Sequence, residues 1–77
     1  MKLEYSGHWK RKREYRRDIS DDLIEYAIQN SDELKDKHWK DASNAICRVP
    51  PVGRILKVVY KRTGNHRIRI ITAFWLD

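Results

Sequence analysis

Four basic side chains near the C-terminus are separated by two or four positions: Lys57 from Lys61, and Arg67 from Arg69. In a β-strand, residues an even number of positions apart point to the same face of the sheet. Like charges gathered on one sheet face repel each other, and phosphate groups relieve this repulsion through charge-assisted hydrogen bonds. The spacing therefore indicates an anion-binding face. An ordinary solvated face of a half-buried sheet is the alternative.

These cations belong to two runs rich in Val, Ile, Tyr and Phe, residues 55–62 and 67–74, with Thr63-Gly64-Asn65 between them. The pattern predicts a β-hairpin. Its loop length matters because a slip of one residue moves a whole strand's apolar set to the other face. An odd loop, for example Arg62-Thr63-Gly64 with Gly64 in the left-handed conformation, separates apolar from basic residues, whereas a two-residue Gly64-Asn65 loop mixes them. We therefore expect an apolar face made by Leu56, Val58, Tyr60, Ile68, Ile70, Thr72 and Phe74.

Composition narrows the class of protein. A length of 77 residues predicts a single domain over residues 1–77. One cysteine, Cys47, excludes an internal disulfide and suggests a cytoplasmic protein in which this thiol is buried. No apolar run is long enough for a membrane span, and no signal-peptide pattern is present at the N-terminus.

Charge is distributed unevenly along a chain of net charge +6. Residues 8–17 and 38–77 are strongly basic, and the segment between them is acidic. This arrangement suits a protein that binds a polyanion with one surface and leaves another for a different partner. In the first basic block, Arg13 and Arg17 are one helical turn apart; a nucleic-acid contact and a solvated helix face are both open readings.

Local patterns predict the remaining elements of an α+β fold. We expect a short strand at residues 1–5, a basic helix at 8–17 anchored by Trp9, and a second helix capped by Ser20 and ending near Asn30. A stripe of Leu23, Ile24, Ala27 and Ile28 marks the buried side of the second helix. A short extended segment at 34–39 and a strand at 45–49 lead into the hairpin, and Pro50 and Pro51 end that strand.

Three stretches resemble the RelE/BrnT superfamily of small toxins from toxin–antitoxin pairs. The hairpin RILKVVYKRTGNHRIRIITA is similar to the LxVVYxxxGxRIRIISA pattern of BrnT-like chains. His8, followed by Arg13, Arg17 and an Ile19-Ser20 helix start, resembles related RelE-like domains. Residues 30–33, Asn-Ser-Asp-Glu, stand where those domains tend to have Asn-Pro-Asp-Glu.

The resemblance implies a RelE-like domain with a short N-terminal strand, two helices and a three-stranded antiparallel meander. It also implies an endoribonuclease that cleaves RNA, free or bound to the ribosome, by attack of the ribose 2′-OH on the adjacent phosphate. A cognate antitoxin protein would neutralise it. Such cleavage needs a base, an acid for the leaving 5′-oxygen and cations around the developing charge. No metal or other cofactor is expected, since neither an HExxH nor a CxxC motif occurs.

By position in these motifs, His8, Lys57 and Arg69 are the catalytic candidates, with a surface or helix-capping role as the alternative for His8. Arg13, Arg17, Arg48, Lys61 and Arg67 are the candidates for RNA binding. BrnT-like toxins usually continue after the last strand with Arg-rich sequence and a further helix, whereas this sequence stops at Asp77. A non-catalytic nucleic-acid-binding module and a basic interaction protein for an acidic partner are therefore the alternatives.

Overall fold

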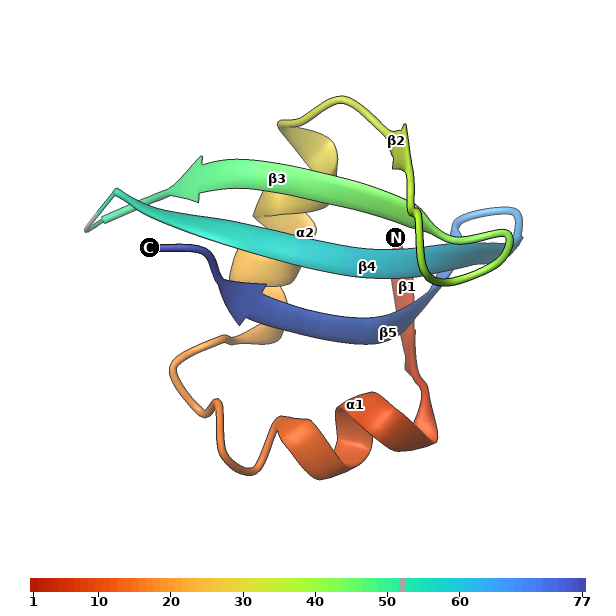
Figure 1. Ribbon diagram of the computed structural model, residues 1–77, viewed down its shortest axis with the longest axis horizontal. Coiled ribbons are helices and arrows are strands. Elements are labelled where there is room, and N and C mark those ends of the chain that lie inside the picture. Colours follow the sequence, from red (N-terminus) through yellow and green to blue (C-terminus); the bar gives the residue numbers. More distant parts are fainter. Residues whose placement is uncertain (52) are drawn as a thin grey trace.

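One mixed sheet of five strands organises the α+β fold, with helix α2 across one face and helix α1 along one side (Figure 1). This structure is a computed structural model, and it describes residues 1–51 and 53–77. The elements in chain order are β1 (Lys2–Tyr5), α1 (Gly7–Lys12), α2 (Asp21–Gln29), β2 (Leu34–Lys35), β3 (Ser43–Val49), β4 (Arg54–Gly64) and β5 (Arg67–Trp75).

The strands lie side by side in the order β1-β5-β4-β3-β2. Strand β1 pairs with β5 in parallel, and all the other pairs are antiparallel. The first strand of the chain therefore lies beside the last, at one edge of the sheet, as far from β2 as the sheet allows. The short strand expected at residues 1–5 is confirmed as β1, whereas only Leu34–Lys35 of the extended segment expected at residues 34–39 is a strand.

Helix α2 forms where the local signals predict it. The Ser20 hydroxyl accepts a hydrogen bond from the Leu23 N–H at 3.2 Å, and two aspartates occupy the first turn, where the helix dipole favours negative charge. Asn30 caps the other end. The expected apolar stripe packs against β3 and β4, where Ile24, Ala27 and Ile28 are buried.

Helix α1 is shorter than the predicted helix at residues 8–17, because regular helix ends at Lys12. Its anchor is confirmed: Trp9 is fully buried in the main core. If the helix continued beyond Lys12, basic side chains one turn apart would repel each other. The chain forms turns there instead, and its basic side chains contact distant parts of the fold. Arg13 instead reaches Asp21, with 3.6 Å between Nη2 and Oδ1.

Arg16 covers the side of β5 that β1 leaves open. Its Nη1 donates to the Ala73 carbonyl oxygen at 3.0 Å and to Thr72 Oγ1 at 3.3 Å. Ser6 Oγ donates to the Ile71 carbonyl oxygen at 3.0 Å on the same edge. The edge of β5 is thus capped by side chains where its strand partner ends.

We expect Arg16→Ala to lower the free energy of unfolding by about 1–2 kcal/mol, because the change removes charged hydrogen bonds to a strand edge. Urea unfolding followed by circular dichroism measures this loss. Arg17→Ala is the matched control, since among residues 1–51 and 53–77 the Arg17 side chain donates to the nearby Glu14 carbonyl oxygen and to no strand edge. Equal losses in the two variants would contradict the edge-capping role.

The hairpin differs from the predicted one in the place of the extra residue that sets its register: this residue lies in a strand and not in the loop. Strand β4 continues to Gly64, and a two-residue turn, Asn65-His66, leads into β5. His66 is the residue in the left-handed region, with φ of 61°, so the expectation for Gly64 is wrong. A bulge supplies the odd residue instead: Arg62 pairs with Ile68 and Gly64 with Arg67, which leaves Thr63 without a cross-strand partner.

A second bulge changes the faces further along β5. Tyr60 pairs with Ile70 and Val59 with Thr72, so Ile71 has no cross-strand partner. Residues after Ile71 are consequently shifted to the opposite face from the one predicted. Ala73 is in the main core, whereas Thr72 and Phe74 lie opposite Val59 and Lys57 on the other face. The expectation that Thr72 and Phe74 join the apolar face is therefore wrong.

The main core lies between the sheet and the helices. Leu56, Val58, Tyr60, Ile68 and Ile70 are buried there, as expected from the hairpin pattern. Strand β3 contributes Ala45 and Val49 to the same core, with Cys47 only partly buried beside them. Within the part of the chain that the structure describes, no helix is long and apolar enough to cross a membrane.

Candidate nucleic-acid interface

The face of the sheet opposite α2, here called the open face, carries the four cations singled out in the hairpin. Lys61 and Arg69 are directly opposite each other across β4 and β5. Lys57 precedes Lys61 by four positions and Arg67 precedes Arg69 by two, so all four point away from Leu56, Val58 and Ile70 in the core. The predicted gathering of these side chains on one face is confirmed.

Few carboxylates of the chain neutralise these cations. Arg69 Nη2 lies 3.9 Å from Glu4 Oε1 on β1, and both side chains are partly exposed. Lys57, Lys61 and Arg67 form no ion pair within residues 1–51 and 53–77. By contrast Arg62, which points to the helix side of the same strand, contacts Glu33 at 2.8 Å. The positive charge of the open face is thus largely available to an external anion.

Arg48 shares the open face but lies at its far end. It is opposite Ile55 in the β3–β4 pair, and its Nη1 donates to the Gly53 carbonyl oxygen at 2.6 Å. This bond ties the guanidinium to the residue that precedes β4.

An aromatic ring lies among the cations because of the second bulge. Phe74 is opposite Lys57, whose Nζ is 5.8 Å from the ring centroid. The Arg16 guanidinium approaches the same ring from the side of α1, at 5.9 Å. A ring beside cations can stack on a nucleic-acid base. Sequence reasoning placed Phe74 in the core, and no local pattern reveals the bulge that moves it.

The segment between β2 and β3, residues 36–42, crosses part of the open face and passes in front of β4 (Figure 1). Ala42 packs against Val59 and Ile71 to form a small second core on this side. Asp36 shapes the segment, since its Oδ2 accepts the backbone N–H groups of His38 at 2.8 Å and Trp39 at 2.6 Å.

Asp36 is an ionised carboxyl held in place by donors. Burial by itself favours its protonated form, but the N–H groups of Trp39 and His38, the Asn44 amide and the charge of Lys57 together lower the pKa of Asp36 below its ordinary value of 3.8. The carboxylate is thus tied both to its own loop and to two residues of the sheet.

Acid should release this loop. A carboxyl whose pKa is lower in the folded state stabilises the fold above its unfolded-state pKa, and the stabilisation disappears as the pH falls through the folded-state value. We expect the backbone amide signals of His38 and Trp39 in NMR spectra to move together below about pH 4. Asp36→Asn should show the moved positions already at neutral pH. Signals that stay fixed during acid titration would contradict this role of Asp36.

Two histidines lie near the open face, one on α1 and one in the 36–42 segment. His8, the predicted acid or base, is partly exposed on α1, and its ring centroid lies 5.8 Å from that of Trp39. It therefore lies at the margin of the open face, against the 36–42 segment. His38 instead lines a hollow that Lys57 also lines. His38 belongs to the loop between β2 and β3, and the path of this loop across the sheet brings it to Lys57.

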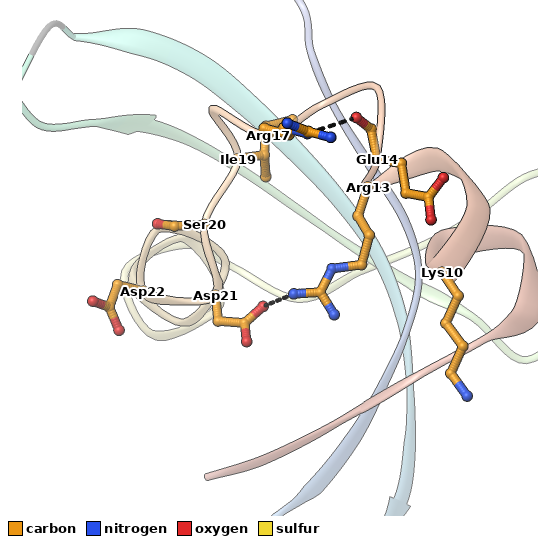
Figure 2. A pocket seen from close by; sticks show the side chains of 8 residues that line it. All are labelled: Lys10, Arg13, Glu14, Arg17, Ile19, Ser20, Asp21 and Asp22. Carbon is orange, nitrogen blue, oxygen red and sulfur yellow. Dashed lines mark hydrogen bonds and ion pairs between the residues drawn. The ribbon is translucent and has the colours of Figure 1, made fainter.

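Arg13 and Arg17, the predicted RNA contacts of the first basic block, lie away from the open face, in a groove between α1 and the start of α2 (Figure 2). The Arg13 guanidinium points toward Asp21 and lies 4.4 Å from the Tyr5 ring centroid. The Tyr5 hydroxyl donates to Asp21, and this bond raises the pKa of Tyr5. Because Glu14, Asp21 and Asp22 line the same groove, its positive charge is offset locally.

No group of three or more His, Cys, Asp or Glu side chains suited to a metal ion occurs in the described ranges 1–51 and 53–77. Comparison of the chain with protein-family models, with curated proteins and with solved structures finds no significant match.

Proposed function

We propose that the open face binds single-stranded RNA through its phosphates and cleaves it. The observation that carries this proposal is that Lys57, Lys61 and Arg67 share one face and form no ion pair with carboxylates in the described part of the chain. A surface of this kind attracts a polyanion and holds successive phosphates. The sequence resemblance to RelE and BrnT toxins supports RNA as that polyanion.

The proposed cleavage needs no metal ion. The 2′-OH of one ribose loses its proton to a base and attacks the adjacent phosphorus. The bond from phosphorus to the 5′-oxygen breaks, that oxygen takes a proton from an acid, and a 2′,3′-cyclic phosphate remains. Lys57 and Arg69 stabilise the negative charge that develops on the phosphate oxygens. His38 lies with Lys57 in one hollow, which makes it a stronger candidate than His8 for one of the two proton transfers.

The biological setting follows from the same resemblance. We propose that the chain is a RelE-like toxin of a toxin–antitoxin pair, acting in the cytoplasm on free or ribosome-bound mRNA. A cognate antitoxin would neutralise it by covering the open face with acidic side chains. Co-expression with a small acidic protein encoded by the neighbouring reading frame would then restore growth.

The test is cleavage of RNA by the purified protein in EDTA and, separately, in ribosome-containing extract that keeps its Mg²⁺. We expect products that end in 2′,3′-cyclic phosphate, and no cleavage where a 2′-deoxyribose replaces the ribose at the cleaved position. His38→Gln should reduce the cleavage rate by about a hundredfold or more, with His66→Gln as the matched control. Intact RNA in both settings would refute the nuclease.

A non-catalytic RNA-binding module is the second candidate, and the position of His8 favours it. Its ring packs near Trp39 rather than beside the cations of the face. Binding without cleavage should still weaken steeply with salt, by a slope of about 0.7 per phosphate neutralised on single strands. Binding that does not change with salt would exclude both candidates.

A further inference from the structure

A hollow of about 310 Å³ lies beside the open face, between the 36–42 segment and strands β3 and β4. It is as large as the smaller ligand sites of proteins. Its lining residues are Leu34, Lys35, Asp36, Lys37, His38, Asn44 and Lys57. The hollow thus combines the aliphatic parts of Leu34 and the lysine side chains with a few polar groups, a combination that ligand sites use to orient a bound molecule.

Asn44 lines this hollow, and one of its hydrogen-bonding atoms has no partner in the described structure. Its side chain is only 8% exposed, and its Oδ1 is buried without a hydrogen-bond partner among the described residues. Leaving a buried acceptor unpaired destabilises the folded state. The backbone around it is held on both sides, because Asn44 pairs with Leu34 of β2 and Val59 of β4. The chain thus keeps a fixed acceptor that lacks a donor.

One charged group, Asp36, is within hydrogen-bond range of that amide. Asp36 is close enough for the Asn44 amide and the Lys57 ammonium to lower its pKa. Two acceptors thus belong to the hollow: the Asp36 carboxylate and Asn44 Oδ1, which is covered in the free protein. Three lysines also line it, and of these Lys57 is the one whose charge acts on Asp36. A ligand that fits this set must carry two neighbouring N–H donors next to an acceptor.

We propose that the hollow binds a guanine base of the RNA held on the open face, so the inference rests on the proposed function and adds a base preference to it. The 2-amino group of guanine donates to Asn44 Oδ1, N1–H donates to the Asp36 carboxylate, and O6 accepts from Lys57. Lys57 keeps two further N–H donors for a neighbouring phosphate. Guanine alone among the four RNA bases presents two adjacent donors and an acceptor on its pairing edge. Adenine and cytosine place a ring acceptor where guanine has N1–H, and uracil has a single donor.

Mononucleotides test the proposal, because GMP, IMP and AMP carry the same phosphate and differ only in the base. We expect GMP to shift the Asn44 side-chain amide signals and the backbone amides of His38 and Trp39 in NMR titrations of the ¹⁵N-labelled protein. IMP lacks the 2-amino group, so it should bind about tenfold more weakly. AMP should bind more weakly still. Equal affinities for all three, or no shifts at these residues up to millimolar concentrations, would overturn the guanine site.

Asn44→Leu separates recognition from folding. Leucine has a similar volume and removes both the unpaired acceptor and the amide that donates to Asp36, and these two losses act in opposite directions on stability. The circular dichroism spectrum should therefore stay that of the folded protein, while the preference for GMP over IMP is lost. Asn65→Leu, in the exposed turn between β4 and β5, is the control and should keep that preference. A preference that survives in Asn44→Leu would overturn the assignment.

The outcomes also distinguish this inference from the proposed function. Equal binding of the three nucleotides with shifts confined to Lys61, Arg67 and Arg69 would remove the guanine site and leave the phosphate-binding face. Selective GMP binding at the hollow without any affinity for RNA would leave the guanine site and remove the RNA-binding face.

Discussion

Replacing both Lys57 and Arg69 by alanine will weaken RNA binding about a hundredfold, and it will abolish measurable cleavage if the chain is a nuclease. Each side chain contributes a charged hydrogen bond to phosphate, and one such bond is worth about 1.5–3 kcal/mol. Two lost bonds correspond to at least two factors of ten in the dissociation constant. Cleavage suffers more, because removing one donor to the transition state costs about a hundredfold or more in rate.

The salt dependence gives an independent measure of the same contacts. Losing two phosphate contacts should lower the slope of log K against log salt by about 1.4 on single-stranded RNA. Fluorescence anisotropy with a labelled RNA at several salt concentrations measures both the affinity and the slope. The fold should persist, since Lys57 forms no ion pair within residues 1–51 and 53–77 and Arg69 has only its long, partly exposed contact with Glu4.

Arg11→Ala with Lys12→Ala is the matched control, because it removes the same charge from exposed positions of α1. Alanine also maintains helix propensity at both positions. Affinity in this control should change by less than about threefold, as expected for distant screened charges. Equal losses in the two double variants would show that net charge, and not the open face, governs binding.

Replacing Trp9 by alanine will unfold most of the protein at room temperature. Trp9 is fully buried, and it is the one buried residue of α1. Removing a buried Trp side chain costs about 3–5 kcal/mol. A single core in a domain of this size supplies about 3–5 kcal/mol of net stability in total. Chemical unfolding followed by circular dichroism should show no folded baseline for Trp9→Ala.

Trp9→Phe is the informative companion. It keeps an aromatic ring in the core and removes the indole Nε1, which is buried without a hydrogen-bond partner in the described structure. Relief of that unpaired donor offsets part of the lost packing, so we expect a net cost of about 1–2 kcal/mol. A folded and stable Trp9→Ala protein would mean that α1 contributes little to the core.

Much of the fold could be predicted because it depends on neighbouring residues. Ser20 and the stripe around Ile24 and Ala27 set helix α2, and alternation of apolar and polar residues set β3, β4 and the first half of β5. The end of α1 could not be predicted in the same way. Arg13 and Arg16 leave the helix for Asp21 and for the edge of β5, and these partners are distant in sequence.

The candidate site was predictable only in part. Spacing alone predicts that four cations share one face, provided that an odd number of residues separates the paired positions of the two strands. These cations are Lys57, Lys61, Arg67 and Arg69. In the structure the bulge at Thr63 supplies the extra residue, and the loop itself has two residues. Arg13 and Arg17 fit the same basic pattern in sequence, yet the structure places them in a separate groove beside acidic side chains.

By itself the sequence determined helix α2, the strands of the hairpin and most of the residues that these elements bury in the main core, and it indicated which cations share the open face. These features follow from local periodicity and residue type. Only the tertiary structure decided that Phe74 joins the cations, that His38 lies with Lys57, and that Asn44 keeps an unpaired acceptor. A bulge and the path of a loop set these positions, and both depend on how side chains far apart in the chain fit together.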